Sequence, residues 1–156
     1  MYKDLRDSPY LRVAVDSISE HSMFAYNYLR GDLPSFSQKD VPLPLTKRIL
    51  RDTLHGIAAL HDKGIVHTDI KPDNILIDWE GTGDSLAVVR VQVADLENVA
   101  YVPDNCEIEG VKLGNWMWRS PEAHVADPTH KPTDMFSFGL VVSLNLSRLN
   151  MATTHT

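Results

Sequence analysis

A polar segment of fixed spacing, His67 to Asn74, stands between a helical pattern and a short apolar run. It reads His-Thr-Asp-Ile-Lys-Pro-Asp-Asn. Asp69 could accept or orient the proton of a hydroxyl group, and Lys71 could neutralise charge on a phosphoryl group in transfer. Asn74 offers an amide oxygen to Mg²⁺, which prefers oxygen ligands. These groups suit phosphoryl transfer, which depends on positioning and on charge stabilisation.

Regular elements are predicted on both sides of this segment. Pro42 and Pro44 can open a helix but could not sit inside one. Apolar residues then recur at helical spacing up to Gly64, a natural helix stop: Leu45, Ile49, Leu50, Leu54, Ile57, Ala58 and Leu60. Gly56 inside this pattern suggests a close approach by a neighbouring element. After the loop, Ile75–Ile77 and Leu86–Val93 read as two strands joined by a turn.

The two ends of the chain carry further patterns. Tyr10–Val15 and Met23–Tyr28 read as short strands that could pair antiparallel. Residues 97–132 show no sustained period, and long ordered loops tend to be functional. A final, largely apolar helix is predicted to begin near Thr133 as its N-cap, with Asp134 in the first turn. Asp95 ends the second strand of the hairpin, where it could reach the same metal as Asn74.

Composition excludes several classes of protein. The chain has 156 residues, which suits one domain, and a net charge of −6, which argues against a nucleic-acid-binding face. Its single cysteine, Cys106, excludes an intrachain disulfide and fits a reducing compartment. No stretch approaches the roughly 20 apolar residues of a membrane span. The start, Met1–Asp7, lacks the apolar core of a signal peptide. We therefore expect a cytoplasmic or nuclear location, with no nucleic-acid and no membrane partner.

At the polar segment the sequence resembles the eukaryotic-type protein kinase family, whose catalytic loop reads His-Arg-Asp-Leu-x-x-x-x-Asn. Lys71, two residues after Asp69, follows the serine/threonine type. Ala94–Glu97 falls where the family has its Asp-Phe-Gly metal-binding turn, and Ser120–Glu122 falls where it has Ala-Pro-Glu. Asp134–Gly139 is similar to the start of the buried helix behind the site. The resemblance spans about residues 8–143. It implies an α+β, kinase-like fold with a mostly helical large lobe and short β-hairpins.

The resemblance also implies roles for individual residues. Asp69 and Lys71 would be catalytic, and Asn74 and Asp95 would hold Mg²⁺ beside ATP. His67, Glu122 and Asp134 would be structural anchors. The hinge side would supply the nucleotide-binding residues, with Tyr26 as gatekeeper, backbone facing adenine, an aspartate near the ribose and a leucine under the base: Tyr26, Asn27, Tyr28, Leu29, Asp32 and Leu76.

Three positions depart from the family pattern. Thr68 replaces the arginine that normally meets a phosphate on the activation loop, so ordering of that loop by phosphate is not expected. Glu97 replaces the glycine of the metal-binding turn, where it could restrict the backbone or add negative charge. Asn115 stands where the family has threonine, and its amide could keep a hydrogen bond to Asp69. Trp116 and Trp118 are interpreted as packing residues that order this loop.

The family's glycine-rich loop and Val-Ala-x-Lys strand do not precede the hinge in this sequence. The expected domains are therefore a remnant of the small lobe and hinge (1–33), a partial large lobe (34–146) and a non-homologous tail (147–156). On this view the final helix exposes apolar faces, which favour aggregation or a partner protein that covers them. We also expect marginal stability.

Two functions follow from these patterns. The first is ATP-dependent phosphoryl transfer to Ser or Thr hydroxyls by the parent domain, with weak or no activity in this chain alone. The alternative is a non-catalytic, pseudokinase-like binding module or a truncated gene product, including an incomplete gene model. The intact Asp69, Lys71 and Asn74 favour the first, whereas Thr68 and Glu97 favour the second. The protein substrate is unknown.

Overall fold

The computed structural model describes residues 5–110 and 112–153, with only the backbone described for residues 148–153. The first four residues of the predicted small-lobe remnant and the last three of the predicted tail lie outside this range. The helices and strands are β1 (Asp16–Ile18), β2 (Met23–Ala25), β3 (Gly31–Asp32), α1 (Leu33–Phe36), α2 (Leu43–His61), β4 (Ile65–Val66), β5 (Ile75–Glu80), β6 (Ala87–Val93), β7 (Ala100–Tyr101), α3 (Pro121–Val125) and α4 (Pro132–Thr153).

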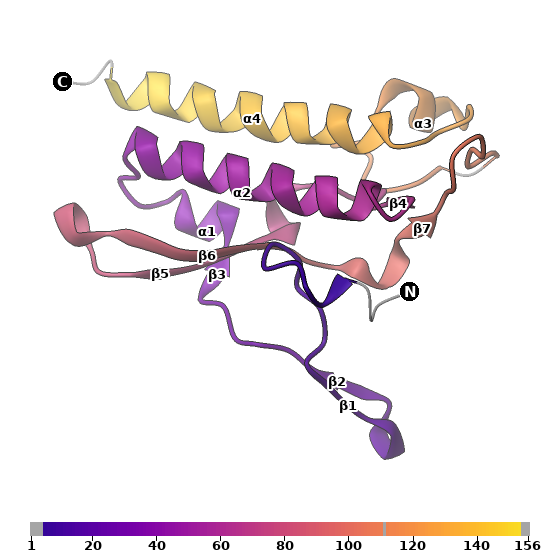
Figure 1. Ribbon diagram of the computed structural model, residues 1–156. Coiled ribbons are helices and arrows are strands. Elements are labelled where there is room, and N and C mark those ends of the chain that lie inside the picture. Colours follow the sequence, from indigo (N-terminus) through magenta and orange to yellow (C-terminus); the bar gives the residue numbers. More distant parts are fainter. Residues whose placement is uncertain (1–4, 111, 154–156) are drawn as a thin grey trace.

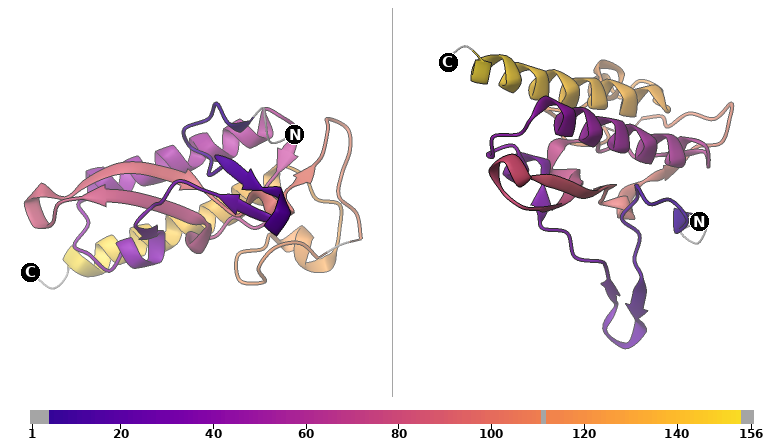
Figure 2. Two further views of the ribbon diagram at one scale, coloured as in Figure 1. Left: turned by 90° about the horizontal axis from the view of Figure 1, so that it is seen from below. Right: turned by 60° about the vertical axis from the view of Figure 1, so that its left-hand side comes forward.

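The elements form a layered body with one projecting arm (Figure 1). Helix α2 lies between α4 on one side and the sheet of order β3-β5-β6 on the other (Figure 1, Figure 2). The β1–β2 hairpin projects away from this body in both views from the side. The fold is thus α+β, with the longer helices on one face of a small antiparallel sheet.

Helix α2 follows from its sequence pattern and from its neighbours. It begins after Pro42 and has Pro44 in its first turn, and the chain beyond it turns at Gly64 with φ of 68°. Its apolar face buries Ile49, Ile57 and Leu60 against the sheet and α4. A Cβ atom at Gly56 would lie 2.8 Å from Val93 Cγ2 and 2.9 Å from the Tyr10 carbonyl oxygen. The predicted close approach at this glycine is therefore present.

The central hairpin places the two ends of the candidate site side by side. Strands β5 and β6 pair antiparallel, with Ile75 opposite Val93. The loop before β5 and the turn after β6 therefore meet at the same end of the hairpin. The pairing continues beyond the ladder, because the amide of Ala94 donates to the carbonyl of Asn74 over 2.8 Å.

The prediction of a strand over Tyr10–Val15 is wrong. Leu11 instead makes an isolated parallel bridge to Val93, and Val13 N donates to the nearby Leu11 carbonyl, a local turn that interrupts an extended strand. The antiparallel ladder is made by β1, further along the chain, which pairs with β2 in the register Asp16 with Ala25. Strand β2 begins at Met23, as predicted, but ends at Ala25 rather than Tyr28.

Helix α4 runs antiparallel to α2 (Figure 1). It is apolar around much of its circumference. Phe138 and Val141 are buried, whereas Met135, Phe136 and Leu146 remain 42, 41 and 47% exposed. The helix begins at Pro132, so Thr133 lies within it rather than at the predicted N-cap, and its hydroxyl lies 2.6 Å from that of Ser120. The helix continues past residue 147, where the predicted tail begins, and that domain boundary stays a prediction. Within the described residues, no helix has the length and apolar character that a bilayer span requires.

Candidate active site

The polar segment is a loop whose backbone is held in place by one carboxylate, that of Asp134. The Oδ2 atom accepts a hydrogen bond from the amide of His67 (2.8 Å) and Oδ1 accepts one from the amide of Thr68 (2.8 Å). The side chain is 1% exposed, and His61 Nε2 at the end of α2 lies 2.9 Å from Oδ2. One buried group thus joins α2, the loop and α4.

His67 is fixed through both ring nitrogens. Its Nε2 lies 2.8 Å from the carbonyl oxygen of Ala94, and its Nδ1 accepts the amide hydrogen of Asp69 over 3.3 Å. A carbonyl can only accept, so these two contacts select the neutral ring with its hydrogen on Nε2. The ring is 1% exposed. It ties the loop to the turn after β6 and is not positioned to take a proton from a substrate.

Asp69 is held at both carboxylate oxygens. Lys71 Nζ lies 2.6 Å from Oδ2, and Asn74 Nδ2 donates to the Asp69 carbonyl oxygen (2.9 Å) and to Oδ2 (3.3 Å). The backbone amide of Asn115 donates to Oδ1 over 2.7 Å. The structure therefore brings together the three residues that the spacing singled out. A carboxylate fixed in this way can orient a hydroxyl group without first reorganising.

The contact between Asn115 and Asp69 differs from the prediction. The side-chain amide of Asn115 does not reach Asp69, because its Oδ1 accepts the amide hydrogen of Met117 over 3.0 Å. The backbone makes the bond instead. Trp116, in the same turn, is 70% exposed, so the interpretation of this residue as a packing residue is wrong, whereas the half-buried Trp118 does pack against the core.

The turn after β6 places Asp95 beside the loop in a left-handed conformation, with φ of 62°. The positive φ of this turn is thus at Asp95. Glu97 does not have a positive φ, so it does not restrict the backbone in the way that the sequence suggested. Partial burial, and then the neighbouring Glu97 carboxylate, raise the pKa of Asp95, and the charge of Asp69 adds to this. Three carboxylates therefore gather at one end of the hairpin.

This arrangement fits a divalent cation whose coordination is completed by the phosphates of a nucleotide. Among the described residues, no group of three or more His, Cys, Asp and Glu side chains could hold a metal by itself. Mg²⁺ does not require such a group, since it commonly takes one or two carboxylates together with substrate phosphates and water. Asn74 and Asp95 offer oxygen ligands of this kind. The negative charge that raises the pKa of Asp95 is also charge that a cation would neutralise.

The nucleotide-binding residues predicted on the hinge side come from the segment between β2 and α1 and from β5. Asn27 and Tyr28 are exposed, the latter by 79%, whereas Leu29 is buried in the body. Asp32 pairs with Leu76 across β3 and β5, so these two lie next to each other as a shared site would require. The Asp32 carboxylate accepts the amide hydrogen of Ser35 over 2.9 Å and caps α1. Their contacts with a nucleotide remain predictions.

Glu122 has no ion-pair partner among the described residues and is half-buried in α3. Its anchoring role remains a prediction.

Sequence reasoning missed a contact at this site. The hydroxyl of Tyr26, at the end of β2, donates to Glu97 Oε1 over 2.6 Å, and the Arg12 guanidinium carbon lies 5.0 Å from the centre of the Tyr26 ring. These residues also line a cavity of about 270 Å³ with Leu96 and residues of β1 and β2. The sequence signalled this contact only through the unusual glutamate at position 97, which did not indicate that Tyr26 is its partner.

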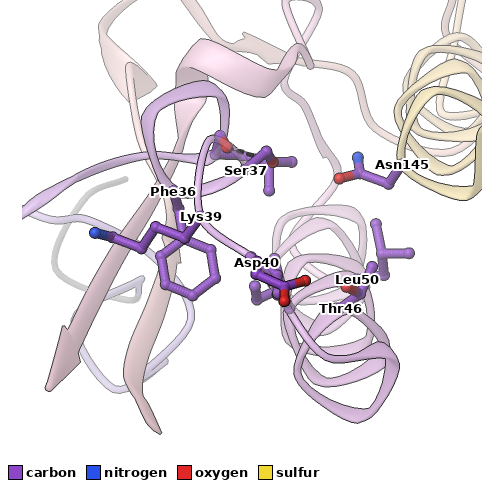
Figure 3. Close-up of a pocket in the computed structure, with 10 residues that line it drawn as sticks. Phe36, Ser37, Lys39, Asp40, Thr46, Leu50 and Asn145 are labelled. Carbon is purple, nitrogen blue, oxygen red and sulfur yellow. Dashed lines mark hydrogen bonds between the residues drawn. The ribbon is translucent and has the colours of Figure 1, made fainter. Parts of the chain in front are cut away.

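A separate cavity of about 150 Å³ lies at the corner between α1, α2 and α4 (Figure 3). Asn145 reaches toward it from α4, and Thr46 and Leu50 face it from α2. Both Thr46 and Asn145 are 7% exposed. None of its lining residues belongs to the polar loop or to the turn after β6, so it is not part of the candidate active site.

Comparison with known proteins agrees with this geometry. The family model of the protein kinase domain matches residues 6–154. The chain therefore belongs to the protein kinase family, and its relatives are of the eukaryotic serine/threonine type. It is 28% identical over 130 residues to serine/threonine-protein kinase pkn2 of Myxococcus xanthus, covering 82% of this chain and 16% of that protein. It is also 28% identical over 131 residues to serine/threonine-protein kinase/endoribonuclease IRE1 of rice (Oryza sativa subsp. japonica). This match covers 81% of this chain and 14% of that protein.

A solved structure shows the same fold. The chain is similar to a chain in the crystal structure of the yeast RNA Pol II CTD kinase CTDK-1 complex, with a TM-score of 0.78 and 20% identity. The match covers 94% of this chain and 48% of the other. The kinase-like α+β fold predicted from the sequence is thereby confirmed. The chain spans less than a fifth of the two relatives named above and about half of the solved chain.

Proposed function

We propose that this chain carries the phosphoryl-transfer loop of a protein kinase that moves the γ-phosphoryl group of ATP to Ser or Thr hydroxyls. The observation that carries the proposal is the fixed carboxylate of Asp69. It is held by Lys71, Asn74 and the Asn115 backbone, with contacts of 2.6 to 3.3 Å. Membership of the protein kinase family supports phosphoryl transfer in general.

The residues of the loop divide the chemistry between them. Asp69 accepts a hydrogen bond from the substrate hydroxyl and orients its oxygen toward the phosphorus atom. Lys71, already beside Asp69, presents its ammonium group to the charge on the transferred phosphoryl group. His67 and Asp134 hold the loop backbone in place, so this arrangement exists before substrate binds.

ATP and Mg²⁺ are the cofactors in this proposal. When bound, Mg²⁺ neutralises phosphate charge. Asn74 and Asp95 would hold it, and the stretch from Tyr26 to Asp32, with Leu76, would receive the nucleoside. Asp32 and Leu76 are adjacent across the β3–β5 pair, which supports one shared pocket for ribose and base.

The test combines binding with transfer. We expect ATP with Mg²⁺ to raise the thermal unfolding midpoint of the purified chain in a dose-dependent manner, because a ligand that binds only the folded state stabilises it. Asp69→Asn keeps the shape of the side chain and should retain this binding. It should lower transfer of labelled phosphate to a Ser-containing peptide by about 100-fold or more. Transfer that Asp69→Asn leaves unchanged would refute the assignment of Asp69.

A second candidate function, binding of another protein without catalysis, is favoured by the apolar surface of α4. Met135, Phe136 and Leu146 are each more than 40% exposed on this helix. The same experiment separates the two functions. A chain that unfolds cooperatively but gains no stability from ATP and Mg²⁺ would support the binding module and count against the enzyme.

A further inference from the structure

The metal-binding turn of this chain is attached to the hinge-side strand by a link that a glycine could not make. Glu97 stands at the position where the family has glycine, and its Oε1 accepts the Tyr26 hydroxyl over 2.6 Å. The two residues are 71 positions apart in the sequence. The link therefore joins the end of β2 to the turn that carries Asp95. A residue without a side chain at position 97 would leave the Tyr26 hydroxyl without this acceptor.

Arg12 reinforces the same link from a third segment. Its guanidinium group lies 5.0 Å from the centre of the Tyr26 ring, a distance at which the cation is attracted to the ring face. The hydrogen bond from Tyr26, and also the charge of Arg12, lower the pKa of Glu97 against the opposing effect of burial. The Arg12 backbone is fixed as well, since its amide donates to the carbonyl of Val93 over 2.8 Å.

The turn needs support of this kind. Asp95 has a φ of 62°, an angle that costs a non-glycine residue free energy unless the surroundings hold it. Leu96 is 4% exposed and fixes the middle of the turn to the core. The side chains of Asp95 and Glu97 remain on the exposed side. The contact between Tyr26 and Glu97 restrains this side of the turn, two residues from Asp95.

We propose that Arg12, Tyr26 and Glu97 form a clasp that positions Asp95 to bind the divalent cation that accompanies the nucleotide. Tyr26 and Glu97 are positioning residues, because they act through Asp95 and not on the phosphate. This inference rests on the proposed function, since it names the residues that prepare its metal site. On this proposal, the glutamate that replaces the family's glycine at position 97 helps to build the metal site.

The experiment measures the Mg²⁺ concentration that half-saturates ADP binding by the full chain. Tyr26→Phe removes only the hydroxyl group and should raise this concentration by about tenfold, the effect of one charge-assisted hydrogen bond. Titrating ADP without metal as well separates this effect from any direct contact of Tyr26 with the nucleoside. Glu97→Gln keeps an acceptor for the hydroxyl and should have a smaller effect than Tyr26→Phe. The double variant Tyr26→Phe with Glu97→Gln should need no more Mg²⁺ than Tyr26→Phe alone, because Tyr26→Phe already removes the hydrogen bond that Glu97→Gln weakens.

Matched controls are available on the exposed surface. Tyr101→Phe removes a hydroxyl from a residue that is 64% exposed, and Glu107→Gln neutralises an exposed carboxylate. Neither should change the Mg²⁺ requirement. If the unaltered chain binds ADP with Mg²⁺ and Tyr26→Phe needs no more Mg²⁺, the clasp is refuted while the proposed function stands. If the unaltered chain shows no Mg²⁺-dependent binding, both are refuted.

Discussion

At the scale of single residues, the two aspartates of the candidate site are held in different ways. Asp69 has a charged partner and amide donors at both oxygens. Asp95 lies in a strained backbone conformation, and its partial burial, together with the carboxylates beside it, raises its pKa above the ordinary value for aspartate. The first side chain is therefore ready for its role without a ligand. The negative charge of the second is stabilised when a cation binds beside it.

Asp32 gives a test of a single side chain by pH. Its burial opposes ionisation, but hydrogen bonds from Ser35 outweigh this and lower the pKa of Asp32. A carboxyl group whose pKa is lower in the folded state stabilises the fold above its unfolded pKa of about 3.9 and loses this contribution as pH falls through the folded pKa. Asp32→Ala should therefore lower the free energy of unfolding by about 1 kcal/mol at pH 7, the usual loss of an N-cap.

The pH dependence distinguishes the charge from the shape of the cap. Asparagine also caps helices well, so Asp32→Asn should be nearly as stable as the unaltered chain at pH 7 but should lack the loss of stability below about pH 4. Urea unfolding at pH 7 and pH 3 measures both. Asp127→Asn, at an exposed position, is the matched control. A parallel pH response in Asp32→Asn and the unaltered chain would count against the assignment.

At the scale of elements, helical spacing and the hairpin were predictable because each is specified by nearby residues. The apolar spacing from Leu45 to Leu60 predicted α2. Ile75–Ile77 and Leu86–Val93 predicted the two strands of the hairpin, although β5 continues to Glu80. The strand predicted at Tyr10 failed because that segment pairs with Val93 through a single bridge, which no local pattern encodes. The contact between Tyr26 and Glu97 was missed for the same reason. Chain-wide pairings are set by the fold as a whole.

Gly56 tests the packing of α2 against the hairpin. Alanine in a helix interior is normally more favourable than glycine by about 1 kcal/mol. At position 56 the added Cβ atom would lie 2.8 Å from Val93 Cγ2 and 2.9 Å from a backbone oxygen, so a neighbour must move. We expect Gly56→Ala to destabilise the chain by about 1–2 kcal/mol, the usual cost of overpacking. Urea denaturation gives the free energy.

The chain contains its own control for this experiment. Gly139 lies in α4, and a Cβ atom there would meet nothing within 4 Å among the described residues. Gly139→Ala should stabilise the chain by about 0.5–1 kcal/mol through helix propensity alone. Opposite signs for the two glycines would show that contact with Val93, and not propensity, decides the outcome at position 56. Equal stabilisation would mean that α2 and β6 pack less closely.

At the scale of the whole molecule, one buried carboxylate connects the layers to the site. Asp134 at the start of α4 accepts hydrogen bonds from the backbone amides of His67 and Thr68. Its Oδ2 also lies 2.9 Å from Nε2 of His61 at the end of α2. Thr68 has a φ of 70°, an angle rare for a β-branched residue, and therefore needs such an anchor. Packing of α4 on α2 and the shape of the loop are thus coupled through a single group.

Asp134→Asn tests this coupling. Asparagine has the same shape but only one oxygen, so either the His67 or the Thr68 amide loses its acceptor and faces an NH₂ group instead. We expect a loss of about 3 kcal/mol in the free energy of unfolding, because a buried, hydrogen-bonded charge is removed while its partners stay buried. Asp62→Asn, at the exposed C-cap of α2, should change stability by less than about 0.5 kcal/mol.

Hydrogen exchange locates the effect within the molecule. In the unaltered chain the amides of His67 and Thr68 should exchange slowly, since both are hydrogen-bonded to a side chain that is 1% exposed. In Asp134→Asn they should exchange faster than the amides within the β5–β6 ladder, which do not contact Asp134. If all amides change together, Asp134 contributes to stability in general. Faster exchange confined to the loop would show that α4 fixes the His67–Asn74 loop through this carboxylate.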